Sequence, residues 1–429
     1  MNNQPERISL FNEFPPVSTA DWEARILSDL KGADYEKKLI RNTPEGFRVK
    51  PYYRFEDLQG MEYLEKLPEM ISEGRQRNEW LICQDIATSG DAVNTIKRVK
   101  DALSGGAQSI HFRFSETHRP GKQFLSGLLD LNTGNHAEFQ FSGIENYRAF
   151  YSSFRESLQK KNISLQSLRG SLGFDPIGKF TLSGKIEHEA DHFDTLAEIF
   201  EESVRAGSKM RVLEVNGRYF QDSGATLVQE LGYALSVAVD YLDKLSDRGI
   251  DPARITGAMQ FNFSTGPDYF MEIAKLRAVR ILWDRICDAY KIPAEKRKIF
   301  IHSTTSSWNL TLYDPYVNML RAATETMSAI LGGADSIAVL PYDHPYGKTR
   351  EFSDRIARNT QIILKEEAYF DKVPDPSAGS YYIENLTHSL AQEAWDLFRK
   401  TETEGGYLKS FVAGTIQHNI TASLNLSLI

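Results

Sequence analysis

The sequence has few cysteines, no long apolar run and no excess of positive charge. Its 429 residues include two cysteines, Cys83 and Cys287, both in apolar surroundings typical of buried thiols in a reducing compartment. No apolar segment approaches the roughly 20 residues that a membrane-spanning helix needs. Residues 1–16 lack the pattern of a secretory signal. The formal net charge of −8 gives no basic surface for nucleic acid, so we expect a cytoplasmic protein without nucleic-acid or membrane partners.

Nucleotide-binding and cobalamin-binding motifs are also missing. The sequence has no P-loop, and no G-x-G-x-x-G follows a predicted strand. Residues 343–347, DHPYG, resemble half of the D-x-H-x-x-G pattern that binds cobalamin, but nothing stands between Asp343 and His344 where that pattern requires a residue. We therefore expect no cofactor and no metal to be bound by this chain.

A regular alternation of strand-like and helix-like segments begins near residue 80. The predicted strands are 80–86, 109–114, 137–143, 167–173, 211–217, 258–264, 298–303 and 336–341. Helical periodicity fills most of the gaps, most clearly over 224–245 and 267–290. Eight strands with helical crossovers predict an α/β fold, a (β/α)8 TIM barrel. A doubly wound open sheet is the alternative.

The remaining segments lie outside the predicted barrel strands. Residues 1–45 have little from which to build a core and are predicted to form an N-terminal arm that docks on something else. The barrel domain is predicted over 46–410 and includes extra C-terminal helices at 352–370 and 386–400. Residues 411–429 are too few for another domain and are predicted to be a C-terminal tail.

A metal-site motif occurs at His188-Glu189-x-x-His192. Two histidines four residues apart share one face of a helix, and the glutamate can act as a base on a metal-bound water, as in zinc hydrolases. Phe193 and Phe200 belong to the apolar stripe of that helix, whereas His188 lies at its acidic start. We interpret the motif as a solvated helix start and keep a zinc hydrolase as an alternative function.

The C-terminal half resembles a known family, the cobalamin-dependent acyl-CoA mutases and above all methylmalonyl-CoA mutase. The stretches that carry the resemblance are 354–387 (DRIARNTQIILKEEAYFDKVPDPSAGSYYIENLT), 269–283, 302–311 and 221–226. They occur in the family's order and spacing. The similarity is strong over about 211–405 and weaker upstream.

The resemblance implies an activity and a partner. In active chains the acyl-CoA threads along the barrel axis, and a separate C-terminal domain holds adenosylcobalamin through a histidine. The cofactor starts a radical 1,2-shift that interconverts methylmalonyl-CoA and succinyl-CoA. Many bacterial enzymes of this family are heterodimers of one active chain and one related chain that has lost activity.

The family's substrate-contacting positions are altered in this sequence. Where active chains have a Tyr-His pair, this chain has Arg218 and Tyr219, and in the sixth strand and after the seventh the family's residues are likewise replaced. The positions that the resemblance marks as vestigial are Arg218, Tyr219, Gln221, Ala258, Gln260, Asn262, His302 and Thr304. The loop 174–193 has no arginine to pair with a substrate carboxylate. We therefore predict no catalytic residue. Two questions stay open: whether Arg218 and Tyr219 simply cap the barrel mouth, and whether His302 is a hydrogen-bonded core histidine.

Together these features predict the small, non-catalytic subunit of a heterodimeric mutase, without the cobalamin-binding domain. Adenosylcobalamin would then be bound by the large catalytic subunit, and acyl-CoA binding by this chain stays open. Two alternatives remain at this point: a barrel cut from a longer mutase chain, and a mutase of altered acyl-CoA specificity.

Overall fold

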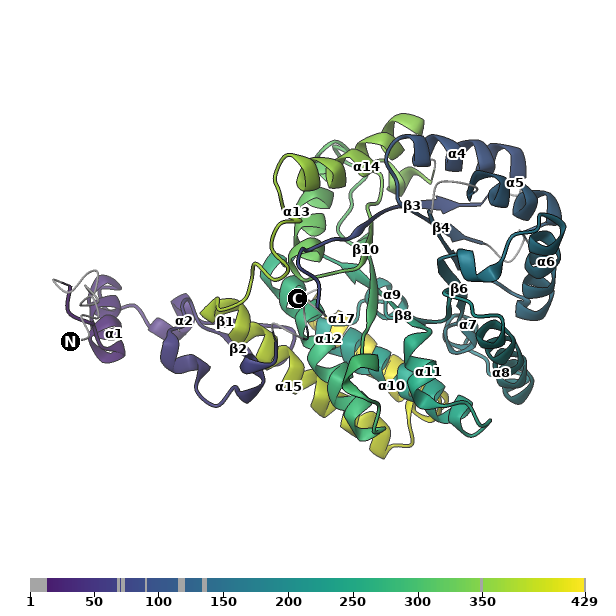
Figure 1. Cartoon of the computed structure of the whole chain (residues 1–429). Coiled ribbons are helices and arrows are strands. Elements are labelled where there is room, and N and C mark those ends of the chain that lie inside the picture. The colour runs from purple at the N-terminus through teal and green to yellow at the C-terminus, as the bar shows by residue number, and fades with distance from the viewer. Residues whose placement is uncertain are drawn as a thin grey trace, which may run out of the picture.

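A computed structural model describes residues 14–67, 70, 74–88, 91–114, 120–132, 137–347 and 350–427. Eight parallel strands close into a barrel in the order β10-β3-β4-β5-β6-β7-β8-β9 (Figure 1). They are β3 (Leu81–Ala87), β4 (Ser109–Arg113), β5 (Glu138–Ser142), β6 (Gly170–Phe174), β7 (Arg211–Asn216), β8 (Met259–Thr265), β9 (Phe300–Thr305) and β10 (Ser336–Ala338). Because β10 pairs with both β3 and β9, the TIM-barrel prediction is confirmed and the open sheet is excluded.

Helices surround the barrel and connect its strands (Figure 1). They are α4 (Ala92–Ser104), α5 (Lys122–Asn132), α6 (Tyr147–Lys160), α7 (Pro176–Ser183), α8 (Glu189–Arg205), α9 (Arg218–Asp222), α10 (Leu227–Ser246), α11 (Pro252–Gly257), α12 (Tyr269–Ala289), α13 (Val317–Leu331), α14 (Glu351–Glu366), α15 (Tyr381–Thr403), α16 (Tyr407–Val412) and α17 (Thr415–Ser427). Short 3-10 helices are η1 (Phe55–Leu58), η2 (Glu62–Glu65), η3 (Leu165–Ser167), η4 (Ala294–Lys296) and η5 (His344–Tyr346). The helices predicted at 224–245 and 267–290 are α10 and α12.

The apolar core lies between the strands and the helices, and the barrel axis is polar. Along β8, Phe261 and Phe263 alternate with Gln260 and Asn262 because successive side chains of a strand point to opposite faces. The Phe261 ring packs edge-on against Trp283 of α12, with centroids 5.0 Å apart. Gln260 instead bonds to side chains of other barrel strands. Most TIM barrels fill the axis with branched apolar side chains, so this polar interior is unusual.

A buried charge cluster fastens the segment that follows α14. Arg277 of α12 is fully buried and pairs with Asp375 and with Glu384, the latter at 2.7 Å. Glu384 also accepts a hydrogen bond from the Gly379 backbone N–H. Pairing of this kind is needed because an isolated buried charge costs several kcal/mol. The family-like stretch DPSAGSYYIE therefore closes over α12.

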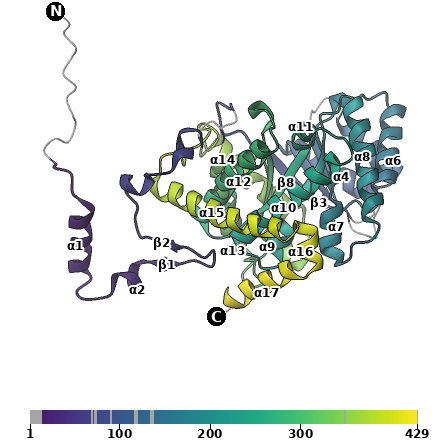
Figure 2. The same ribbon diagram turned by 90° about the horizontal axis from the view of Figure 1, so that it is seen from below.

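The N-terminal arm projects away from the barrel (Figures 1 and 2). It consists of α1 (Thr19–Asp29), α2 (Tyr35–Leu39) and a hairpin of β1 (Arg41–Asn42) and β2 (Arg48–Val49). Neither of the two described helices buries any residue, and Trp22 and Leu27 of α1 are about half exposed. The arm therefore has no core of its own.

One buried carboxylate joins the hairpin to the barrel. Glu45, between β1 and β2, accepts hydrogen bonds from the backbone N–H groups of Leu227 (3.1 Å) and Val228 (2.8 Å). These N–H groups lie in the first turn of α10, where no partner exists within the helix. A negative charge there is also stabilised by the helix dipole. Glu45 thus fixes the base of the arm, although burial raises its pKa.

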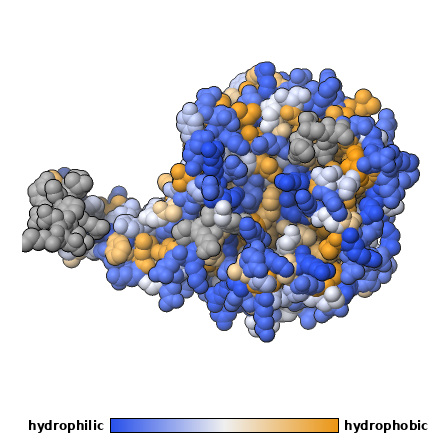
Figure 3. Space-filling view, viewed as in Figure 1, coloured by the Kyte–Doolittle hydropathy of each residue, from blue (hydrophilic) through white to orange (hydrophobic). Residues whose placement is uncertain are grey.

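The C-terminal helices pack on the same side of the barrel as α9 (Figure 2). Ile416 and Ile420 of α17 are buried, and Gln229 of α10 donates hydrogen bonds to Asn419 O (3.1 Å) and Ser423 Oγ (2.8 Å). The viewed face of the molecule is mostly hydrophilic, with hydrophobic side chains scattered over it (Figure 3). None of the described helices is long and apolar enough to span a membrane.

Candidate functional site

Glutamine and serine side chains meet across the middle of the barrel axis. Gln260 of β8 donates from Nε2 to Oε1 of Gln140 on β5, at 2.8 Å. Gln140 Nε2 lies 3.0 Å from Ser336 Oγ of β10 and 2.9 Å from Ser109 Oγ of β4. Because β5, β8 and β10 are not neighbours in the barrel, these bonds cross the axis. All four side chains are at most 1% exposed, so the axis is filled at this level.

An ion pair crosses the N-terminal end of the barrel. Arg211, Glu138 and Phe300 are the first residues of β7, β5 and β9. The Arg211 guanidinium lies 2.7 Å from Glu138 Oε2, and its central carbon lies 3.5 Å from the centre of the Phe300 ring. Arg211 Nε also donates to Gln260 Oε1 at 2.9 Å. The guanidinium therefore joins the end of the barrel to the filled middle.

The other end of the axis holds two histidines and an aspartate. Arg113 Nε lies 2.8 Å from Asp85 Oδ2, and His111 Nδ1 lies 3.4 Å from Asp85 Oδ1. Burial raises the pKa of Asp85, but the Arg113 charge and the contact with His111 outweigh it and hold that pKa well below its usual range. The His111 and His302 rings are 5.0 Å apart. Burial lowers the pKa of His302 well below its usual value, so this imidazole is neutral at pH 7.

Arg218 and Tyr219 begin α9, directly after β7 and its following glycine. Arg218 Nη1 lies 3.5 Å from Thr304 Oγ1 of β9, and its Nε is buried without a hydrogen-bond partner among the described residues. Thr304 in turn lies 3.4 Å from His302 Nε2. The Arg218 guanidinium therefore sits over the C-terminal end of the axis. Tyr219 is half-buried beside a separate pocket between β5, β6 and β7.

Two buried carboxyl groups line that pocket, which has a volume of about 150 Å³. Glu214 of β7 accepts hydrogen bonds from Asn262 Nδ2 (2.6 Å) and Asn216 Nδ2 (2.8 Å), yet burial raises its pKa well above the usual range. Asp175, which follows β6, accepts from the Tyr241 hydroxyl at 2.5 Å. Burial raises the pKa of Asp175 to about 6. A carboxylate substrate would need a cation here, and the two groups have the opposite character.

Comparison with known proteins places the chain in a family. The sequence model of methylmalonyl-CoA mutase matches residues 146–426. The small subunit of methylmalonyl-CoA mutase from Porphyromonas gingivalis is 41% identical, over 97% of this chain and 68% of that one. The chain belongs to the methylmalonyl-CoA mutase family. The Streptomyces virginiae small subunit is 30% identical with the same coverage of both chains. The Porphyromonas gingivalis large subunit is 30% identical, over 88% of this chain and 57% of that one.

Most of the positions that the family resemblance marked do lie together in the barrel. Gln260, Asn262, His302 and Thr304 line the axis, and Arg218 covers its C-terminal end.

Three positions lie elsewhere. Tyr219 lies beside the separate pocket between β5, β6 and β7. Gln221 of α9 turns to Ser306 Oγ (2.8 Å), just past β9. Ala258 ends α11 and precedes β8, because the strand begins one residue later than predicted, at Met259. The Ala258 side chain packs against the apolar core.

About half of the polar side chains in the barrel interior were not identified from the sequence. The residues it did not single out are Asp85, His111, Arg113, Glu138, Gln140, Arg211 and Glu214. A signal for them exists in the strands, where a polar residue alternates with an apolar one, as in HFRF and EFQFS. Alternation predicts that these side chains share one face, but not that they bond across the axis.

The interior does not fit adenosylcobalamin chemistry or an acyl chain. A substrate or adenosyl group reaching into the axis would displace the Gln140, Gln260 and His302 side chains, each buried and hydrogen-bonded. Each buried polar group left without a partner costs about 1–3 kcal/mol. We therefore derive no radical step through the residues of this chain.

The H-E-x-x-H motif does not assemble a metal site. His188 precedes α8 with a left-handed backbone (φ 52°), and its side chain is 80% exposed and 3.7 Å from Asp191. His192 packs edge-on against the Phe180 and Tyr147 rings. In the part of the chain that the structure describes, no three His, Cys, Asp or Glu side chains cluster as metal ligands do. The zinc-hydrolase alternative is therefore left without a ligand set there.

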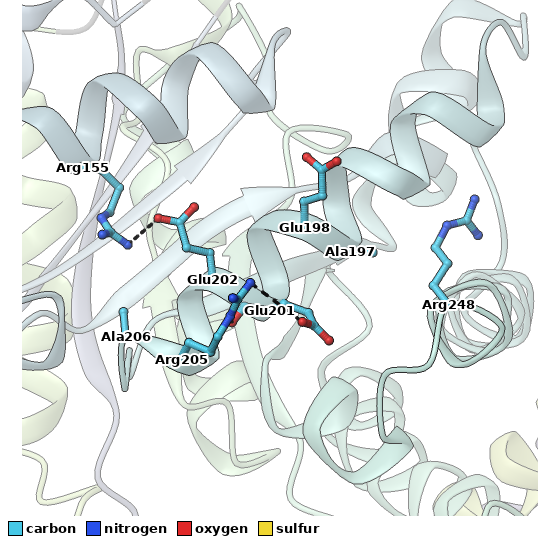
Figure 4. A pocket seen from close by; sticks show the side chains of 8 residues that line it. All are labelled: Arg155, Ala197, Glu198, Glu201, Glu202, Arg205, Ala206 and Arg248. Atoms are coloured by element: carbon cyan, nitrogen blue, oxygen red, sulfur yellow. Dashed lines mark hydrogen bonds and ion pairs between the residues drawn. The ribbon is translucent and has the colours of Figure 1, made fainter.

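A larger groove on the outer surface, of about 830 Å³, lies between α6 and α8 (Figure 4). Its charged side chains are paired. Arg155 lies 2.8 Å from Glu202, and Arg205 lies 3.9 Å from Glu201, as the dashed lines in Figure 4 show. Exposed pairs of this kind contribute little and leave no charge to recognise a ligand. We do not regard this groove as the functional site.

Proposed function

We propose that this chain belongs to the small, non-catalytic subunit of a heterodimeric methylmalonyl-CoA mutase. The enzyme would interconvert methylmalonyl-CoA and succinyl-CoA in the cytoplasm. The family depends on adenosylcobalamin; in this proposal the large subunit binds it and carries the reaction. The higher identity to the Porphyromonas gingivalis small subunit (41%) than to its large subunit (30%) supports this assignment.

The observation that carries the proposal is the set of hydrogen bonds across the barrel axis. An acyl-CoA in the axis would have to break the Gln140–Gln260 bond, for which the thioester offers poor replacement partners. At the N-terminal end it would also have to displace the Arg211–Glu138 ion pair. Breaking a buried ion pair costs about 3–5 kcal/mol. Acyl-CoA binding in the axis is thus opposed twice, by the hydrogen bonds in the middle of the barrel and by the ion pair at its N-terminal end.

In this proposal no residue of the chain is catalytic, and the former substrate positions have become structural. Arg218 covers the end of the axis, and Gln260, Asn262, His302 and Thr304 hold one another in place. This arrangement would keep the barrel rigid without a ligand, as a supporting subunit needs. Residues 1–45 would then be the docking arm, 46–410 the supporting barrel and 411–429 a tail.

Co-expression with the large subunit of the same organism tests the proposal. We expect a stable 1:1 complex in gel filtration with light scattering, with mutase activity that depends on the large subunit. A Trp22→Ala, Leu27→Ala double variant in α1 should weaken the complex, whereas Leu182→Ala, which removes an exposed apolar side chain of α7, serves as the control. Clean separation of the two chains would contradict the proposal.

A further inference from the structure

The pocket between β5, β6 and β7 has features of a ligand site that the proposed supporting role does not use. Its lining includes Asp175, Glu214, Tyr219, Lys179, Ile144 and Leu182. A cavity of about 150 Å³ is large enough to hold benzene when it is apolar. The pocket therefore has room for a ligand of about six non-hydrogen atoms.

One carboxylate oxygen in the pocket has no partner. Asp175 is 8% exposed, and its Oδ1 accepts hydrogen bonds from the Tyr241 hydroxyl and the Gly178 N–H. Its Oδ2 is buried, and no described residue donates to it. A buried acceptor left unsatisfied costs about 1–3 kcal/mol. A donor brought by a ligand would therefore recover this cost, once a small movement of the Asp175 side chain uncovers the oxygen.

The neighbouring groups indicate which charge and shape a matching ligand would have. Glu214 is 2% exposed and is a second carboxyl group facing the same pocket. Ile144 and Leu182 supply apolar surface beside the carboxyl groups. Two carboxyl groups whose oxygens accept hydrogen bonds, beside an apolar wall, complement an alkyl chain that ends in a cationic donor.

Glycines shape the backbone around the pocket. Gly143 (φ 73°) and Gly173 (φ 62°) have left-handed conformations in its wall. A Cβ at Gly173 would lie 1.5 Å from the Phe141 carbonyl oxygen, and a Cβ at Gly178 would lie 2.0 Å from Asp175 Oδ2. Both positions therefore require glycine, which lets β5 approach β6 and lets the Asp175 carboxyl group pack against the start of α7.

We propose that this pocket binds a small primary alkylammonium ion, with its ammonium group donating to Asp175 and Glu214. Among the described residues no three His, Cys, Asp or Glu side chains are grouped so that they could hold a metal ion, so an organic cation is the better match for this pocket. Lys179 is held at the pocket by Glu145, 2.9 Å away, and opposes a second cation. The proposed site does not rest on the pairing with a large subunit.

Two probes of similar shape and opposite charge test the proposal. Propylammonium and propionate are titrated into the full chain by saturation-transfer NMR at constant ionic strength. We expect saturable, roughly millimolar binding of propylammonium, as its few atoms allow, and no saturable binding of propionate. Equal binding of both probes, or of neither, would overturn the proposal.

Variants locate the binding. Asp175→Asn and Glu214→Gln each keep the oxygen that accepts the existing hydrogen bonds, and each should weaken propylammonium binding at least about tenfold. Lys179→Gln removes a like charge and should strengthen it. Glu198→Gln, in the outer groove of Figure 4, is the matched control and should change nothing. If both amide variants bind as the unchanged chain does, or if Lys179→Gln weakens binding, the assignment is wrong.

Discussion

Arg211 and Glu138 form a 2.7 Å ion pair that joins two strands, β7 and β5, which are not neighbours in the barrel. Both side chains are 12% exposed. Because the guanidinium also bonds to Gln260, one residue connects the end of the barrel with its filled middle. This connection explains why the axis is closed over more than one level.

Breaking this pair should destabilise the fold. We expect Arg211→Met to lower the free energy of unfolding by about 3 kcal/mol, since Glu138 would be left nearly buried without its partner. Urea unfolding followed by circular dichroism measures the change. Arg205→Met, which removes an exposed pair with Glu201 on α8, is the control and should cost less than about 1 kcal/mol. Equal losses of unfolding free energy in the two variants would show that the pair across the barrel contributes no more than an exposed ion pair.

The hydrogen bond between Gln140 and Gln260 should stabilise the fold only while both side chains are present. Gln260→Ala leaves Gln140 Oε1 and Arg211 Nε without their partners, so we expect a loss of about 1–3 kcal/mol. A double-mutant cycle with Gln140→Ala isolates the shared term. Strictly additive losses would mean that the two side chains do not interact across the axis.

The stability of the chain should depend on the ionisation of Asp175. The pKa of this carboxyl is about 6 in the folded state, against about 3.9 in an unfolded chain. The folded state therefore binds the proton more tightly, and the stability this gives is present below about pH 3.9 and lost as the pH rises through about 6. The Asp175→Asn side chain cannot titrate. Relative to that variant, the free energy of unfolding of the unchanged chain should fall by about 3 kcal/mol across that window.

Urea unfolding of both proteins at several pH values between about 3.5 and 7 measures this difference. Titrating groups far from Asp175 are common to the two proteins and largely cancel, whereas Glu214, whose pKa the Asp175 charge helps to raise, is replaced by Gln in both proteins to remove its contribution. A difference in stability that stays flat with pH would show that Asp175 is not protonated in the folded chain.

Removing the Glu45 carboxylate should free the N-terminal arm. Glu45→Ala deletes the two hydrogen bonds to the start of α10, for which we expect a loss of about 1–2 kcal/mol. The hairpin of β1 and β2 should also become more sensitive to proteolysis. Glu23→Ala in the exposed helix α1 is the control. Unchanged cleavage rates in Glu45→Ala would mean that other contacts hold the arm.

The strands could be predicted from the sequence because apolar and β-branched residues repeat along them. One end is wrong by three residues in each of two strands: β6, predicted at 167–173, is found at Gly170–Phe174, and β10, predicted at 336–341, is found at Ser336–Ala338. Leu165–Ser167 form a 3-10 turn, so β6 starts later. Gly170 and Gly173 also have positive φ values, which a pattern of side chains does not reveal.

The site could be predicted only where the family motif marks it. His302 and Thr304 lie in a stretch that resembles the family, so they could be picked out. Gln140 and Asp85 lie in weakly similar strands, and two partners of Gln140, Gln260 and Ser336, come from strands far along the chain. Barrel closure is a long-range property that local periodicity does not encode.

Isothermal titration with methylmalonyl-CoA and succinyl-CoA tests the sealed barrel most directly. The large subunit alone provides the positive control, and the 1:1 complex shows whether pairing changes the result. We expect no binding heat from this chain alone and one acyl-CoA bound per complex. Stoichiometric micromolar binding by this chain alone would contradict the proposal that its barrel is closed and non-catalytic.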